Sequence, residues 1–238
     1  MPVIISVILI PVTALVILFL LLYYPADKTA LDAMRSDDTV TVSETGYGYF
    51  FDGPTDHSCL IFYPGAKVEA AAYAPLLHSL AAAGIDAFVV RMPFEIAFFN
   101  ANGADDVLST HNYSEWYMGG HSLGGVVASD YAAAHSDTFA GIILLASYPN
   151  NPLPESLTEI QLIGSEDLVI RADMVNNTET NSPKNCIRHI IEGGNHAQFG
   201  SYGSQFGDGI ATISAEEQIR ETVDTIISLI GDRTPEMQ

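Results

Sequence analysis

The sequence predicts an α/β fold, a doubly wound and mostly parallel sheet flanked by helices and preceded by one transmembrane helix. Three observations support this prediction. Short apolar runs typical of buried strands alternate along the chain with helical patterns, which indicates a parallel sheet covered on both faces. A serine lies between glycines in Gly120-His121-Ser122-Leu123-Gly124, where a strand would turn sharply into a helix. Residues 2–22 carry no charge, and the full length of 238 residues fits one domain with additional segments.

The first element is the uncharged segment 2–22, which has about the 20 residues that a helix needs to span a bilayer. Tyr23 and Tyr24 follow it, where interfacial aromatic side chains sit. A cleaved signal peptide is the alternative, but the segment has neither a basic start nor a small-residue cleavage site. We therefore divide the chain into a transmembrane anchor (1–25), a polar tether (26–38) and an α/β domain (39–238).

The orientation of this anchor is predicted from two opposing signals. Lys28 and Arg35 follow the apolar segment, and positive charge on that side favours a cytoplasmic domain. An N-terminal anchor of this kind more often exports the domain that follows. We expect a single-pass protein of the cell membrane with its catalytic domain on the extracytoplasmic side.

The strands and helices of the domain follow in order. Residues 39–43 and 47–51 alternate in polarity around the turn Glu44-Thr45-Gly46, which predicts a hairpin. Apolar runs predict further strands over residues 59–63, 85–90, 115–118, 139–145, 160–163 and 187–191. Helical patterns cover residues 70–83, 122–135 and 215–230, with an interrupted helix over 95–108.

Composition limits the possible partners. The net charge of −20, from 29 acidic and 9 basic residues, disfavours nucleic acid because the phosphates would be repelled. The carboxylates are scattered, which is typical of a solvated surface. Cys59 and Cys186 lie in or beside apolar, strand-like segments and form no metal-ligand spacing with a histidine. We expect neither a metal nor an organic cofactor.

The glycine-flanked Ser122 is the candidate nucleophile. Glycines permit the strained turn and the close passage of the helix over the strand, and the serine hydroxyl then emerges at the carboxyl edge of the sheet. The alternative is a phosphate-binding turn at a helix start. A P-loop would need Gly-Lys-Ser or Gly-Lys-Thr, which this turn does not have.

A serine hydroxyl needs a base, usually a histidine that is oriented by a carboxylate. Two later turns provide candidates, each at the end of a predicted strand. The turn after residue 163 carries Glu166 and Asp167, and the turn after residue 191 carries His196. This order of nucleophile, acid and base along the chain suits an α/β sheet. The residues alone leave the choice between the two acids open.

An oxyanion hole needs two preorganised donors. The backbone N–H of Leu123, directly after the nucleophile, is the first candidate. The turn Tyr63-Pro64-Gly65-Ala66-Lys67 follows an earlier strand, and Gly65 allows its backbone to turn inward. We expect the N–H of Ala66 to be the second donor.

These four turns give the chain its resemblance to a known family. Residues 39–231 resemble a compact α/β-hydrolase of the dienelactone-hydrolase-like and small bacterial esterase type. The resemblance implies a Ser122–His196–Asp167 triad in an ester-cleaving enzyme that works through an acyl-enzyme, and it favours Asp167 over Glu166. The chain departs from the family at Pro64-Gly65, where His-Gly is usual.

The substrate is expected to be a small-molecule ester or related acyl compound. Lys67, Phe94, Phe98 and Phe199 are candidates for its pocket, although a solvent-facing lysine and core aromatics are the plain alternatives. The predicted connection 146–159 is too short for a large lid, so loops near 94–99 and 200–209 would select the substrate. A thioesterase, a lipid-cleaving enzyme, an acyltransferase or a membrane-tethered binding module could use the same fold.

Overall fold

The computed structural model describes residues 16, 22–170, 175–176 and 178–231. The segment expected to span a membrane, residues 2–22, lies outside the described residues apart from Val16 and Leu22. Within the described part of the chain, no helix combines the length and the apolar character needed to cross a bilayer. In the range expected to be a polar tether, the chain forms the short helix α2 (Lys28–Ala33). The Asp27 side chain caps this helix by accepting from the N–H of Ala30 at 3.0 Å.

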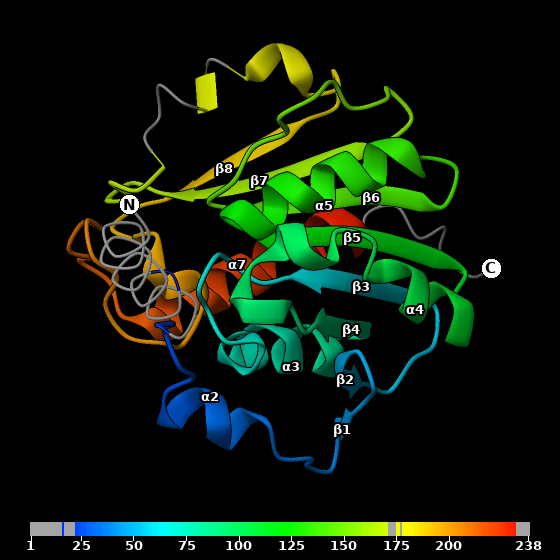
Figure 1. Ribbon diagram of the computed structural model, residues 1–238, viewed down its shortest axis with the longest axis horizontal. Coiled ribbons are helices and arrows are strands. Elements are labelled where there is room, and N and C mark those ends of the chain that lie inside the picture. The colour runs from blue at the N-terminus through cyan, green and yellow to red at the C-terminus, as the bar shows by residue number, and fades with distance from the viewer. Residues whose placement is uncertain (1–15, 17–21, 171–174, 177, 232–238) are drawn as a thin grey trace, which may run out of the picture.

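One eight-stranded sheet forms the centre of the molecule (Figure 1), in the order β1-β2-β4-β3-β5-β6-β7-β8. Its strands are β1 (Thr41–Glu44), β2 (Gly48–Asp52), β3 (Ser58–Tyr63), β4 (Ile85–Val90), β5 (Glu115–His121), β6 (Phe139–Leu145), β7 (Thr158–Gly164) and β8 (Ile187–Ile191). The first two pair antiparallel and β2 joins β4 antiparallel, whereas all remaining neighbours are parallel. The predicted hairpin and the mostly parallel sheet are therefore confirmed.

Helices cover both faces of this sheet. Leu60 and Phe62 of β3 belong to a core shared with α3 (Ala74–Ala82) and α7 (Ala215–Gly231). Cys59 and Ile61 of the same strand belong to a second core shared with α4 (Ala104–Thr110) and α5 (Leu123–Ala134). Alternate residues of a strand point to opposite faces, so α3 and α7 lie on one face and α4 and α5 on the other (Figure 1). Each large apolar side chain buried there stabilises the fold by about 1.5–3 kcal/mol.

The expected interrupted helix over 95–108 takes a different form. Two short 3-10 helices, Pro93–Glu95 and Ala97–Asn100, precede α4. Phe94 and Glu95 both have φ at 56°, in the left-handed region, and a helix cannot continue through such residues. The loop after β4 is consequently held in an irregular, strained path.

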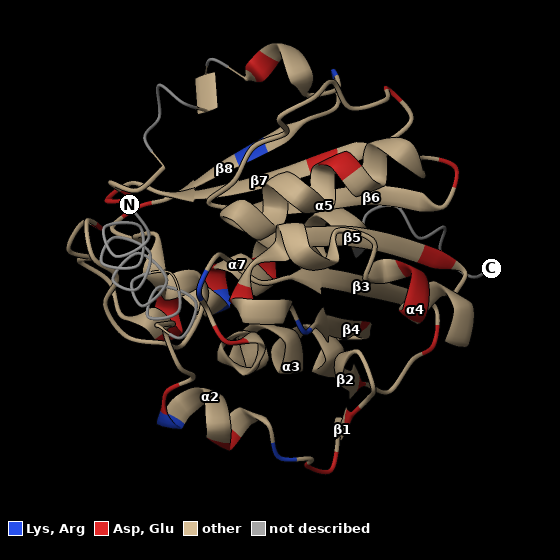
Figure 2. Cartoon of the chain, in the orientation of Figure 1, with Lys and Arg blue, Asp and Glu red and all other residues tan. Residues whose placement is uncertain are grey.

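Acidic residues are spread over the molecule, and basic residues are few (Figure 2). Cys59 is buried, Cys186 is half-buried, and both are free thiols.

The main consequence of the fold for function lies in the middle of the sheet, at the carboxyl ends of β3 and β5. The chain passes from β3 outward to β4 and then returns to β5 on the other side of β3. The carboxyl ends of β3 and β5 therefore flank a topological switch point, where open α/β sheets bind their ligands.

Candidate active site

Ser122 lies at this switch point, between β5 and α5. Its backbone has φ 52° and ψ −126°, which is a strained conformation for a residue with a side chain. Two hydrogen bonds hold it there: its N–H donates to the carbonyl of Leu145 at 3.0 Å, and its own carbonyl accepts from the Ser147 hydroxyl at 2.8 Å. The strain is typical of a turn that presents a nucleophile, and the Ser122 side chain is only partly buried.

The glycines on either side of Ser122 are required by close approaches. A Cβ on Gly120 would lie 2.6 Å from the backbone of Gly124 and Gly125, at the start of α5. A Cβ on Gly124 would lie 2.2 Å from the carbonyl oxygen of Pro64. The glycines thus let the turn close and let α5 approach the loop that follows β3.

His196 and Asp167 meet on the loops after β8 and β7. Nδ1 of His196 lies 2.8 Å from Oδ2 of Asp167, and both side chains are fully buried. The other carboxylate oxygen, Oδ1, accepts from the N–H groups of Val169 and Ile170, each at 2.8 Å. The carboxylate therefore accepts a hydrogen bond from the Nδ1–H group, which fixes the orientation of the ring. Glu166 makes its side-chain contact instead with the exposed hydroxyl of Ser165, at 3.3 Å.

The other ring nitrogen of His196 is the one that can act as a base. Nε2 is buried and has no hydrogen-bond partner among the described residues, so no hydrogen bond joins it to Ser122. Because Nδ1 donates to Asp167, Nε2 of the neutral ring carries a lone pair. Hydrogen bonds between nucleophile and base are often long in a free enzyme and tighten when substrate binds.

The two candidate oxyanion donors lie on α5 and on the loop after β3. Leu123 is the first residue of α5, and N–H groups in a first helical turn have no acceptor within the helix. In the β3 loop, Gly65, Lys67 and Val68 donate to Tyr73, Glu95 and Gly65 respectively. The Ala66 N–H donates to no other described residue.

A buried chain of hydrogen bonds joins the β3 loop to the His196 loop. The Gly65 N–H donates to the Tyr73 hydroxyl at 2.9 Å, and that oxygen lies 2.8 Å from Nδ1 of His121. Nε2 of His121 lies 3.1 Å from the carbonyl oxygen of His196. A carbonyl only accepts, so Nε2 carries the proton and Nδ1 accepts from Tyr73. Burial, and then the neighbouring His196, hold the pKa of His121 well below its ordinary value, which keeps the ring neutral.

The loop around His196 is fixed by two further side chains. The Asp208 carboxylate accepts from the N–H groups of His196 and Ala197, at 3.2 and 2.8 Å. Gln218 of α7 bonds to both the N–H and the carbonyl of Asn195, at 2.9 and 2.8 Å. The base is thereby held by its backbone as well as by Asp167.

The predicted pocket residues lie in different environments. Phe94 and Phe98 are exposed on the loop after β4, whereas Phe199 is buried, its ring centroid 5.9 Å from that of His121. Lys67 is half-buried beside Glu95, whose carbonyl accepts from the Lys67 N–H. Burial, and then Glu69, raise the pKa of Glu95 to about 7.

Sequence patterns did not indicate several residues of this site. Tyr73, Asp208 and Gln218 belong to no motif, because each acts through hydrogen bonds to residues that are not its neighbours in the sequence. His121 belongs to the Ser122 turn, but its side chain turns toward Tyr73 and the His196 backbone. Only its place beside the nucleophile could have drawn attention to it.

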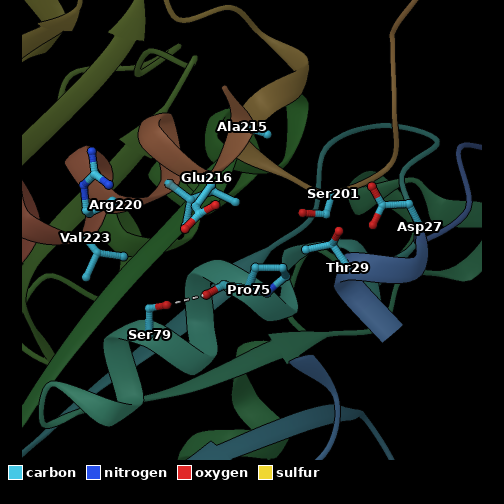
Figure 3. Close-up of a pocket in the computed structure, with 10 residues that line it drawn as sticks. Asp27, Thr29, Pro75, Ser79, Ser201, Ala215, Glu216, Arg220 and Val223 are labelled. Atoms are coloured by element: carbon cyan, nitrogen blue, oxygen red, sulfur yellow. Dashed lines mark hydrogen bonds between the residues drawn. The ribbon is translucent and has the colours of Figure 1, made fainter. Parts of the chain in front are cut away.

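Two cavities are found among the described residues of the domain, and only one of them borders the proposed triad. One of about 180 Å³ adjoins Asp167 and is lined partly by Ile163, Ile170 and Val175. Another of about 480 Å³ opens between α2, α3 and α7 (Figure 3), and its lining includes neither Ser122 nor His196. Across the described residues, no three His, Cys, Asp or Glu side chains are grouped to hold a metal ion.

Comparisons with known proteins agree with this architecture. A model described as the alpha/beta hydrolase family matches residues 59–220. No curated protein matches the chain in sequence. A structure described as a predicted CIB-like hydrolase from Thermoplasma acidophilum is 14% identical at a TM-score of 0.58, over 79% of this chain and 99% of its own.

Two esterases have a similar fold. Est1E from Butyrivibrio proteoclasticus is 14% identical at a TM-score of 0.56, over 82% of this chain and 100% of its own. Naproxen esterase (carboxylesterase NP) from Bacillus subtilis is 11% identical at a TM-score of 0.58, over 85% of this chain and 94% of its own. At these identities the likeness concerns the fold.

Proposed function

The chain belongs to the alpha/beta hydrolase family, and on this premise we propose that it is a serine hydrolase that cleaves carboxylic esters. Family membership makes it a hydrolase. The observation that carries the proposal is the buried contact of His196 Nδ1 with Asp167, which leaves Nε2 as a base at the sheet edge that bears the strained Ser122. The esterase names of two proteins with this fold support the choice of substrate bond.

The first half of the reaction forms an acyl-enzyme. Ser122 Oγ attacks the ester carbonyl carbon while Nε2 of His196 takes the hydroxyl proton. The carbonyl oxygen becomes an oxyanion and accepts from the N–H groups of Leu123 and Ala66. When the tetrahedral intermediate collapses, the C–O bond to the alcohol breaks and His196 gives its proton to the leaving alkoxide.

The second half uses the same groups in reverse. His196 takes a proton from water, the hydroxide attacks the acyl carbon, and Ser122 leaves with the proton returned by His196. Asp167 stabilises the imidazolium in both halves and holds it in the productive tautomer. Glu166 has no role in this scheme, since its carboxylate contacts the exposed Ser165.

The uncharged segment 2–22 supports a location of this activity at a membrane. In this proposal residues 1–25 anchor the chain in the cell membrane, and the catalytic domain lies on the extracytoplasmic side. A thioester would pass through the same steps, so the acyl bond itself has to be decided by assay.

A fluorophosphonate probe tests the proposed function. The wild-type chain is expected to be labelled and to hydrolyse p-nitrophenyl esters. Ser122→Ala is expected to lose both, whereas Ser109→Ala, an exposed serine of α4, should keep both. No labelling of the wild type, or equal labelling of Ser122→Ala, would overturn the hydrolase proposal. Parallel assays with p-nitrophenyl esters of increasing chain length and with thioesters then identify the acyl bond.

A further inference from the structure

Exposed apolar side chains gather on the loops at the carboxyl edge of the sheet. We call Phe94, Phe98, Phe99, Leu168, Phe206 and Ile210 the apolar rim. All six are more than half exposed, and Phe206 and Ile210 reach 96% and 89%. Single exposed apolar residues are ordinary, but a group of them on one face marks an interaction site.

Backbone contacts connect the loops of the apolar rim around the Ser122 edge. The loop after β4 joins the loop after β3 where the Lys67 N–H donates to the carbonyl of Glu95, at 2.6 Å. Tyr24 joins that loop to the one after β8, because its N–H donates to Lys67 and its hydroxyl accepts from the Phe206 N–H at 3.3 Å. Gly209 belongs to the loop after β8, and a Cβ at this position would lie 3.3 Å from the side chain of Leu168. The loop after β7, which carries Leu168, is therefore in contact with the loop after β8.

The N-terminal segment joins the domain at the loop after β3, which is one of these connected loops. Tyr24 forms a parallel bridge with Val68, and its carbonyl accepts from the Glu69 N–H at 3.0 Å. Leu22 and Tyr23, directly before it, are 61% and 49% exposed. Tyr24 is therefore fixed on the loop that carries the proposed oxyanion donor Ala66.

The sequence before Tyr24 indicates what covers the apolar rim. Residues 1–26 contain no Asp, Glu, Lys or Arg, and the 21 residues from 2 to 22 would span about 30 Å as a helix, the thickness of a bilayer core. Leu22 is two residues from Tyr24, and two extended residues reach about 7 Å at most. A bilayer spanned by this segment would have its surface close to the apolar rim.

We propose that the apolar rim lies on the bilayer surface and that the substrate is the acyl ester of a membrane lipid. This inference rests on the proposed ester hydrolase activity. A lipid whose carbonyl reaches Ser122 from the bilayer transfers its acyl group to Oγ and returns to the bilayer as the alcohol. The rim itself offers only apolar surface, and the net charge of −20 opposes an anionic membrane, so the partner is a zwitterionic lipid surface.

Fluorescence quenching by lipid tests the docking. The full-length chain is reconstituted into vesicles of phosphatidylcholine with brominated acyl chains, which quench a tryptophan that touches them. Phe206→Trp introduces the reporter on the apolar rim. Ser114→Trp places it at an exposed position before β5, at the opposite edge of the sheet, and Trp116 is common to both variants. Several-fold stronger quenching at position 206 is expected. Quenching at 206 that is no stronger than at 114 overturns the docking.

A kinetic assay separates this inference from the proposed function. Vesicle-bound wild type and the Ile210→Ser variant are given soluble p-nitrophenyl acetate and a fluorogenic phosphatidylcholine within the bilayer. The variant is expected to hydrolyse the soluble ester at the wild-type rate and the lipid at least tenfold more slowly. Equal lipid hydrolysis by both, or a wild type that cleaves only the soluble ester, overturns the lipid inference. A wild type that cleaves neither ester overturns the hydrolase proposal.

Discussion

The hydroxyl oxygen of Tyr73 lies 2.8 Å from Nδ1 of His121, and both side chains are completely buried. The same oxygen accepts from the Gly65 N–H, and His121 in turn donates to the carbonyl of His196. One neutral pair of side chains thus couples the loop of the proposed oxyanion hole to the loop of the proposed base. Buried networks of this kind rigidify a site when every member has its partner.

Tyr73→Phe is expected to lower kcat about tenfold to a hundredfold, since small displacements of catalytic groups have effects of that size. The substitution keeps the ring but leaves the Gly65 N–H and His121 Nδ1 without partners, which also costs about 1–3 kcal/mol of stability. Because Tyr73 positions loops and does not touch substrate in this proposal, KM should change little. Steady-state kinetics with a soluble ester and thermal unfolding measure the two effects.

Tyr131→Phe is the matched control. Tyr131 is also buried and donates to a carboxylate, that of Asp105, but it lies on α5 away from His196. It should lose stability and retain kcat. Equal losses of kcat in both variants, or an unchanged kcat in Tyr73→Phe, would show that the Tyr73–His121 pair does not position the site.

The parts of the site that the sequence could predict are those encoded in local turns. Ser122, Asp167 and His196 each follow a strand within a short glycine-containing turn, so a few adjacent residues reveal their place at the carboxyl edge. The strands themselves are apolar runs whose burial follows from composition. Local patterns therefore sufficed for the sheet and for these candidate residues.

Contacts between distant segments could not be predicted in this way. Tyr73 and His121 are 48 residues apart, and Gln218 reaches Asn195 across 23 residues. The sequence predicted residues 23–25 to end a transmembrane anchor and residues 26–38 to form a polar tether, and neither pattern indicates where this segment lies on the domain. Its position depends on main-chain hydrogen bonds from Tyr24 to Lys67 and Glu69, which any side chain permits and no composition reveals.

Asp167→Asn is expected to lower kcat by about three to four orders of magnitude, the effect typical of a triad acid. The amide keeps the shape of the carboxylate but removes the charge that stabilises the imidazolium, and it can turn its NH2 group toward Nδ1. Glu166→Gln, one position earlier, should change kcat less than about twofold. Kinetics of the two variants on a p-nitrophenyl ester decide between the acids. The opposite ranking would assign the role to Glu166.

Gly124→Ala is expected to destabilise the fold and to displace the loop after β3, which carries the proposed oxyanion donor Ala66. The added Cβ would lie 2.2 Å from the carbonyl oxygen of Pro64 and 2.3 Å from that of Tyr63, both backbone atoms that cannot move without the loop. Overpacking of this kind costs about 1–3 kcal/mol or more. Gly46→Ala, in the β1–β2 turn, has nothing within 4 Å of its new Cβ and serves as the control. Thermal unfolding should show a lower Tm for Gly124→Ala alone, and equal Tm values would contradict the close approach.

Glu95→Gln is expected to stabilise the protein at neutral and alkaline pH but not at acidic pH. Burial, followed by repulsion from Glu69, raises the pKa of the Glu95 carboxyl from 4.5 to about 7, and Arg91 and Lys67 only partly oppose this. A folded pKa above the unfolded one means that the folded chain binds more protons between these two values. Stability therefore falls as pH rises from about 4.5 to 7, and the full penalty is present above pH 7.

Thermal unfolding of wild type and Glu95→Gln across pH 4.5–8 measures this penalty. The Tm difference in favour of the variant should be near zero at the acidic end, grow toward pH 7 and then level off. Since Glu95 is only half-buried and solvent screens its charge, the final difference should be on the order of 2 °C. Glu192→Gln removes an exposed carboxylate and should give no such trend. A pH-independent Tm difference for Glu95→Gln would contradict the raised pKa and place the effect in packing alone.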